Sequence, residues 1–122
     1  MTIAYWCLPV AMFLPLVWAG VAKSGGTDYN NANPRGWLAQ QEGRSMRANW
    51  AQQNSYEAFP PFAAAVIVAH LTSSPQNIVD ALAVAFVVAR IAYGVCYITD
   101  SPAMRSASWS VGFVATIALF VI

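Results

Sequence analysis

Apolar stretches long enough to form membrane-spanning helices alternate with short polar connections along this chain. They lie at residues 3–22, within 37–71, at 76–98 and at 103–122, and about 20 apolar residues in a helix cross the hydrocarbon core of a bilayer. Gly-Gly, Asn-Asn and Asn-Pro pairs mark the first connection, and Ser-Pro pairs mark the two others. The pattern predicts an all-α integral membrane protein: one domain over 1–122, folded as a four-helix up-down antiparallel bundle.

The composition fits a membrane protein better than a soluble one. Hydrophobic residues make up 58% of the chain and charged residues 9%, which is far fewer charges than soluble domains carry. The net charge of +1 and the absence of a basic run exclude nucleic acid as a partner. Cys7 and Cys96 lie in apolar surroundings without metal-site or CxxC spacing, so we interpret them as reduced structural thiols.

Basic side chains indicate how the helices cross the membrane. They gather in or beside the first and third connections: Lys23, Arg35, Arg44, Arg47 and Arg105. The two chain ends and the second connection carry none. The positive-inside rule therefore predicts that the first and third connections are cytoplasmic and that both termini lie outside.

The most informative stretch is 47–71, which begins polar and ends as uninterrupted hydrophobe. Arg47, Asn54 and Glu57 share one helical face. A carboxylate carried into a bilayer is costly and indicates a functional site when it has a partner. Pro60 and Pro61 remove helix hydrogen bonds just beyond Glu57, and the freed carbonyls favour a polar cavity between packed helices over lipid.

A second polar stripe follows on the third and fourth helices. Arg90, Tyr93 and Tyr97 share one face at i, i+3 and i+7. Arg105 and Ser106 begin the fourth helix. An antiparallel layout brings this stripe to the same depth as the polar face of 47–71. Together these groups suit a small anionic ligand with peptide-like groups: Arg47, Asn54, Tyr93, Tyr97, Arg105 and Ser106.

Structural explanations remain open for each part of this set. Arg90 and Glu57 can simply neutralise one another, the tyrosines can form an interfacial aromatic belt, and Arg105 can anchor its helix at the cytoplasmic surface. His70 is interpreted as a packing residue, and Asp80 as a charge that meets the dipole of its own helix. No residue set with metal-ligand spacing is present, so no metal is expected.

Three motifs resemble the membrane-associated proteins in eicosanoid and glutathione metabolism, the MAPEG family. They are NSYEAFPPF at 54–62, ARIAYGVCY at 89–97 and DSPAMRSASW at 100–109. The resemblance implies a homotrimer of four-helix subunits that binds glutathione as a co-substrate between neighbouring subunits, near the cytoplasmic side. It also implies a bacterial-type member similar to microsomal glutathione transferase and prostaglandin E synthase, located in the bacterial inner membrane.

The resemblance also implies roles for individual residues. Arg105 corresponds to the arginine that stabilises the glutathione thiolate, and Ser106 to a neighbouring hydroxyl. A cation and a hydroxyl at the sulfur favour the thiolate, which is the nucleophile. The remaining positions hold the peptide or orient the residues that do: Asn54, Glu57, Arg90, Tyr93 and Tyr97.

Three positions depart from the family pattern. Trp50 stands where many catalytic members have arginine, Gln53 where the prostaglandin branch has arginine, and Trp109 where a tyrosine is usual. The resulting hypothesis is a glutathione S-transferase or peroxidase that acts on small lipophilic electrophiles drawn from the bilayer. The alternative, favoured by Trp50 and Gln53, is a non-catalytic lipid-binding or structural subunit of a membrane assembly with the same fold.

Overall fold

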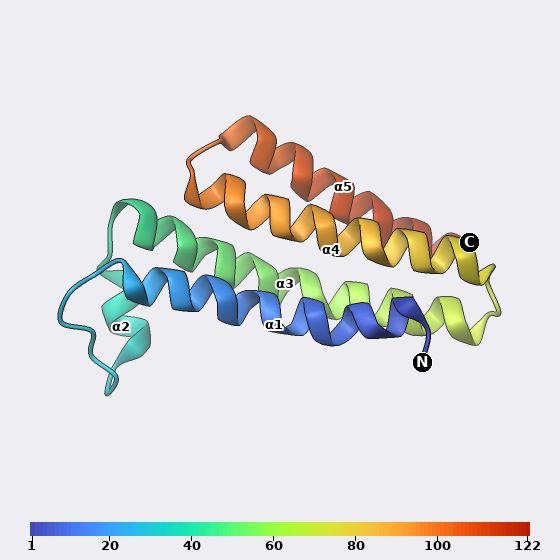
Figure 1. Ribbon diagram of the computed structural model, residues 1–122, viewed down its shortest axis with the longest axis horizontal. Helices are drawn as coiled ribbons and strands as arrows, with labels where there is room; N and C mark the ends of the chain where they lie inside the picture. The colour runs from blue at the N-terminus through green and yellow to red at the C-terminus, as the bar shows by residue number, and fades with distance from the viewer.

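The computed structural model describes residues 1–122 as an all-α chain without strands. Four long helices lie side by side and alternate in direction, and a short helix lies at the end where the first long helix stops (Figure 1). The two chain ends lie at the opposite end of the molecule. The helices are α1 (Ile3–Ser24), α2 (Pro34–Ala39), α3 (Gly43–Leu71), α4 (Gln76–Ile98) and α5 (Pro102–Val121).

The helix predicted over 37–71 is divided in the structure, and that prediction is wrong at its start. Helix α2 ends at Ala39, Glu42 is extended with φ −127° and ψ 167°, and α3 begins at Gly43. Gly43 has a φ of +61°, a left-handed conformation that glycine adopts at little cost. The Gln-, Arg- and Ala-rich composition favours helix on both sides of this break and so conceals it.

Three helices are long and apolar enough to cross a membrane: α1, α4 and α5. Helix α3, which the sequence predicts as a fourth span, does not meet this criterion by composition because its first half is polar. Its 29 residues give a length of roughly 44 Å, whereas the hydrocarbon core is about 30 Å thick. Helix α3 as a whole is therefore long enough for its polar first half to extend beyond the hydrocarbon core.

Small side chains allow close packing at the centre of the molecule. Phe62 of α3 stacks on Phe86 of α4 with ring centroids 3.8 Å apart and an interplanar angle of 6°. Alanines from four helices surround this pair, as is usual where membrane helices approach closely. The main core cluster joins α1, α3, α4 and α5 through Ala4, Cys7, Ala11, Phe62, Ala65, Val66, Ala69, Val79, Ala83, Phe86, Val87, Ala115 and Leu119.

A glycine sets the distance between α1 and α4. The indole of Trp18, which is buried, lies directly over Gly94, and a Cβ added to Gly94 would be 2.6 Å from Trp18 Cη2 and closer still to Cζ2 and Cε2. Carbon atoms in contact are normally about 3.5–4.0 Å apart. The two helices therefore reach this separation only because residue 94 has no side chain.

Side chains of α3 and α4 complete the first turn of α1. The carboxylate of Asp80 accepts a hydrogen bond of 2.9 Å from the backbone N–H of Ala4. Thr2, the N-cap of α1, has its hydroxyl 2.8 Å from Nε2 of His70, whose Nδ1 lies 2.7 Å from the carbonyl oxygen of Val66. The sequence assigns Asp80 to the dipole of its own helix, but its carboxylate caps α1 because the two helices lie side by side.

Candidate functional site

Asn54 joins the charged residues of α3 and α4. Its Oδ1 accepts a hydrogen bond of 2.8 Å from Arg90 Nη2, and its Nδ2 donates one of 3.2 Å to Glu57 Oε2. Arg90 is 3% exposed, while Glu57 is exposed. The guanidinium of Arg90 also lies 4.2 Å from the ring centroid of Tyr93, a cation–π distance. A neutral amide thus connects the arginine to the carboxylate.

This geometry differs from the direct neutralisation that the sequence leaves open for Arg90 and Glu57. Their charges are connected through Asn54, and Glu57 lines an open pocket between α3 and α4. A buried arginine that polarises an amide in this way also fixes which end of the amide faces the acid, since only Oδ1 can accept and only Nδ2 can donate. Arg90 therefore positions Glu57 through an intermediate residue.

The tyrosine stripe forms the wall of the groove between α3 and α5. Tyr93 and Tyr97 meet edge to face, with centroids 5.6 Å apart. The guanidinium of Arg105 lies 4.6 Å from the ring centroid of Tyr97. Trp50 of α3 also lies near Tyr97, with the two ring centroids 6.0 Å apart. Through Arg105, the first turn of α5 therefore contacts Tyr97, which lines the same pocket as Asn54.

Two adjoining pockets occupy this groove and share Asn54, Tyr93 and Tyr97. The first, of about 300 Å³, is lined by Asn54, Tyr93, Tyr97, Arg105, Ser106, Trp109 and Ser110. The second, of about 370 Å³, is lined by Trp50, Gln53, Asn54, Glu57, Tyr93 and Tyr97. Cationic, hydroxyl and amide groups therefore line a continuous polar surface that reaches from α5 to the carboxylate of α3.

Arg47, which the sequence places in this set, has a different position. Its Nε and Nη2 donate hydrogen bonds of 3.3 and 3.1 Å to the carbonyl oxygen of Ile98, the last residue of α4. A cation at the C-terminal end of a helix satisfies carbonyls that lack a helical partner. Arg47 lines neither of the two pockets, and its contacts tie the base of α3 to the end of α4.

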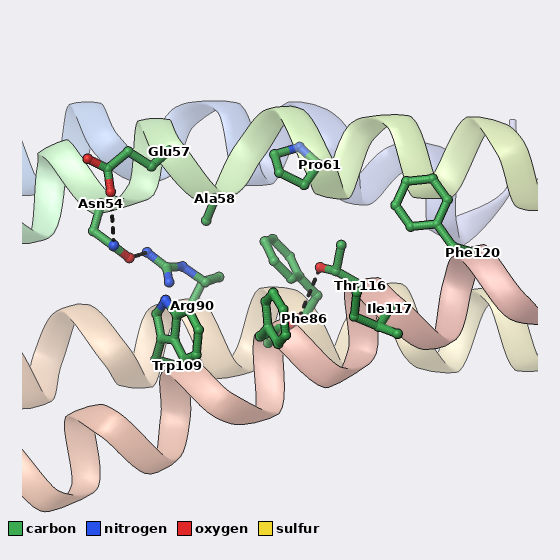
Figure 2. A pocket seen from close by; sticks show the side chains of 12 residues that line it. Asn54, Glu57, Ala58, Pro61, Phe86, Arg90, Trp109, Thr116, Ile117 and Phe120 are labelled. Atoms are coloured by element: carbon green, nitrogen blue, oxygen red, sulfur yellow. Dashed lines mark hydrogen bonds between the residues drawn. The ribbon is translucent and has the colours of Figure 1, made fainter.

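Sequence reasoning missed a third cavity, of about 270 Å³, between α3, α4 and α5. Figure 2 shows Asn54, Glu57 and Arg90 at one end of it and Phe120 at the other. The sequence feature that comes closest to indicating this cavity is the glycine at position 112, which lines it. A Cβ added to Gly112 would lie 3.5 Å from Arg90 Cδ. The lining residues are Asn54, Glu57, Ala58, Pro61, Phe86, Arg90, Trp109, Gly112, Phe113, Thr116, Ile117 and Phe120.

An all-α chain with three helices able to span a membrane, and with a polar groove between α3 and α5, defines a helical membrane protein. A sequence model of the MAPEG family matches residues 3–122, which takes in every helix. The chain therefore belongs to the MAPEG family, membrane proteins of eicosanoid and glutathione metabolism. No curated protein and no solved structure matched the chain.

Proposed function

We propose that this protein binds glutathione, or a similar low-molecular-weight thiol, in the groove between α3 and α5 and uses its thiolate as a nucleophile. The observation that carries the proposal is the position of Arg105, whose guanidinium lies over Tyr97 and beside Ser106 in the same pocket as Asn54. A cation and a hydroxyl in one partly enclosed pocket lower the cost of forming a thiolate. Glu57, facing the groove, suits the amino group of the tripeptide.

In the transferase reaction, the thiol loses its proton to water and the sulfur forms a bond to an electrophilic carbon. Either a leaving group departs with the electron pair of its bond, or the neighbouring carbon gains a proton. In the peroxidase reaction, two thiols are oxidised to one disulfide while a lipid hydroperoxide is reduced to an alcohol and water. Arg105 would stabilise the thiolate in both reactions, with Ser106 as a hydrogen-bond donor.

The proposal includes an assembly and an orientation. We infer a homotrimer of four-helix subunits, with α3 as the fourth span, in a bacterial inner membrane, and the first and third connections in the cytoplasm. Lys23, Arg35, Arg44, Arg47 and Arg105 all belong to segments at one end of the molecule, whereas both chain ends lie at the other (Figure 1). This charge asymmetry supports the orientation.

The test is ultraviolet difference absorbance of the thiolate as glutathione is titrated into the purified protein in detergent. We expect a saturable signal that is lost in Arg105→Ala and retained in Arg44→Ala, which removes an exposed arginine of the α3 base. With an electrophilic substrate, Arg105→Ala should lower kcat by about 10²–10³-fold, the usual effect of removing one such group. No signal at millimolar glutathione would rule out the glutathione reaction.

The second candidate is a non-catalytic lipid-binding or structural subunit. It is favoured by Trp50, whose side chain lies against Tyr97 within the groove at a position where an arginine would add a cation for an anionic peptide. Trp50→Arg distinguishes the two candidates. A thiolate signal absent from the parent and present in Trp50→Arg would favour the non-catalytic subunit, whereas a signal present in both favours the thiol enzyme.

A further inference from the structure

A fourth cavity, of about 520 Å³, lies between α2 and the first half of α3. Helix α2 is at the end of the bundle away from the chain termini (Figure 1). It contributes Arg35, Leu38 and Ala39, which are spaced as neighbours on one helical face. Polar side chains of α3 recur at the same helical spacing and form the opposite wall: Asn49, Gln52, Gln53 and Tyr56.

Two amides of this cavity lack hydrogen-bond partners in the protein. Asn49 is 8% exposed and lines the cavity, and its amide makes no hydrogen bond to another group of the chain. Gln52 Oε1 is buried and has no donor, and a buried acceptor left in this state costs about 1–3 kcal/mol. The last torsion of a glutamine is soft, so this amide can turn toward a ligand. A molecule that fits the cavity therefore supplies hydrogen-bond donors to these amides.

The charge of the cavity is positive and has no opposing acid. Arg35 is exposed, and no carboxylate lines the cavity. Its guanidinium presents a fork of N–H donors that matches the oxygens of a phosphate. An ammonium in this cavity would face Arg35 without an acid to neutralise it. Uncharged hydroxyls are therefore better donors for Asn49 and Gln52, and the ligand is an anion that also carries hydroxyl groups.

The size and position of the cavity narrow the class of ligand. At roughly 30 Å³ for each heavy atom, the volume of a water molecule in the liquid, about 520 Å³ holds about 17 heavy atoms, far more than an inorganic phosphate contains. Trp50 and Tyr56, which also line the cavity, are exposed, and such aromatic side chains are typical of the membrane–water interface. The phosphates of a membrane lie at this level, and basic side chains attract them.

We propose that this cavity binds a glycerol phosphate group, with its phosphate on Arg35 and its hydroxyls on the amides of Asn49 and Gln52. The headgroup of phosphatidylglycerol and free glycerol phosphate both present this chemistry. Trp50 and Gln53 also line the groove between α3 and α5, but the three residues that hold the ligand do not. The inference does not depend on the proposed function.

The first experiment is isothermal titration calorimetry of the full-length protein in an uncharged detergent. We expect sn-glycerol 3-phosphate to bind at a single saturable site. O-phosphoethanolamine carries an ammonium instead of hydroxyls, and inorganic phosphate lacks the glycerol. Both should bind at least about tenfold more weakly, because an unmade hydrogen bond to a buried group costs about this factor.

The second experiment distinguishes the two sources of the ligand. The protein is reconstituted into nanodiscs that contain equal amounts of phosphatidylglycerol and phosphatidylethanolamine, and the lipids that it retains in mild detergent are counted by native mass spectrometry. Preferential retention of phosphatidylglycerol that is lost in Arg35→Gln identifies a lipid headgroup. Equal retention of the two lipids, together with binding of glycerol 3-phosphate in the calorimeter, identifies a free glycerol phosphate.

The two arginines of this end of the molecule provide a matched pair of variants. Arg44 is exposed, as Arg35 is, but does not line the cavity. We expect Arg35→Gln to weaken binding at least about tenfold and Arg44→Gln to leave it unchanged. Gln52→Met keeps the length of the side chain without its amide, so it should reduce the preference for glycerol 3-phosphate over O-phosphoethanolamine. Circular dichroism establishes that each variant is folded.

Three outcomes would overturn the inference. One is equal binding by folded Arg35→Gln and Arg44→Gln. Another is equal affinity for glycerol 3-phosphate and O-phosphoethanolamine. The third is the absence of binding in the calorimeter together with equal retention of the two lipids. Neither experiment contains glutathione, and the thiolate signal of the groove is measured without glycerol phosphate, so the two proposals fail independently.

Discussion

The contact between Trp18 and Gly94 makes a sharp prediction about helix packing. In Gly94→Ala the new Cβ would lie 2.6 Å from Trp18 Cη2 and closer still to Cζ2 and Cε2. The indole is buried, so it must retreat by at least about 1 Å to restore an ordinary carbon–carbon contact. Forcing one extra methyl group into a well-packed interior costs about 1–3 kcal/mol.

Gly20→Ala is the matched control, because Gly20 is also inside a helix and a Cβ there would meet nothing within 4 Å. Replacing helical glycine by alanine stabilises a helix by about 0.5–1 kcal/mol. We therefore expect Gly20→Ala to raise the free energy of unfolding slightly and Gly94→Ala to lower it by about 1–3 kcal/mol. Unfolding is followed by circular dichroism as the mole fraction of sodium dodecyl sulfate increases in mixed micelles.

A double-variant cycle shows whether the loss comes from the indole. Trp18→Leu creates space where the added methyl group needs it, so Gly94→Ala should destabilise the Trp18→Leu background less than it destabilises the parent, by about 1 kcal/mol or more. If Gly94→Ala and Gly20→Ala change the stability equally, the α1–α4 contact does not limit packing and the reasoning is wrong.

Two further predictions concern the helix ends. Asp80→Ala should lower the free energy of unfolding by about 1–2 kcal/mol because it removes the acceptor for the N–H of Ala4. Asp80→Asn keeps an acceptor oxygen and should recover part of this loss in the same assay. Arg47→Met should cost about 1 kcal/mol because it removes both donors to the carbonyl of Ile98; a stability equal to that of the parent would contradict the capping role.

Helical periodicity was sufficient to predict much of the groove. The spacing of Tyr93 and Tyr97 on one helix, together with antiparallel order, places them near Asn54 and Arg105, and all four line one pocket. Hydrophobic length predicted four membrane spans, and three of them, α1, α4 and α5, are long and apolar enough to cross a membrane. These features depend on local repeats and on chain order, both of which a single sequence contains.

Other features depend on the rotation and register of one helix against another, which local patterns do not specify. The partner of Arg47 is a backbone carbonyl of α4, and a carbonyl has no sequence signature. The amide of Asn54 stands between Arg90 and Glu57 because of the relative height of α3 and α4. The cavity between α3, α4 and α5 arises from gaps among three helices, so no single segment indicates it.

The capping of α1 has a consequence for the order in which the protein is assembled. Chains are synthesised from the N-terminus, so α1 is made before Asp80 of α4, the residue that accepts the N–H of Ala4. Until α4 has been made and has packed against α1, that N–H has no protein acceptor and the first turn is free to fray. The first turn of α1 therefore reaches its full set of hydrogen bonds only after a helix made later in synthesis has packed against it.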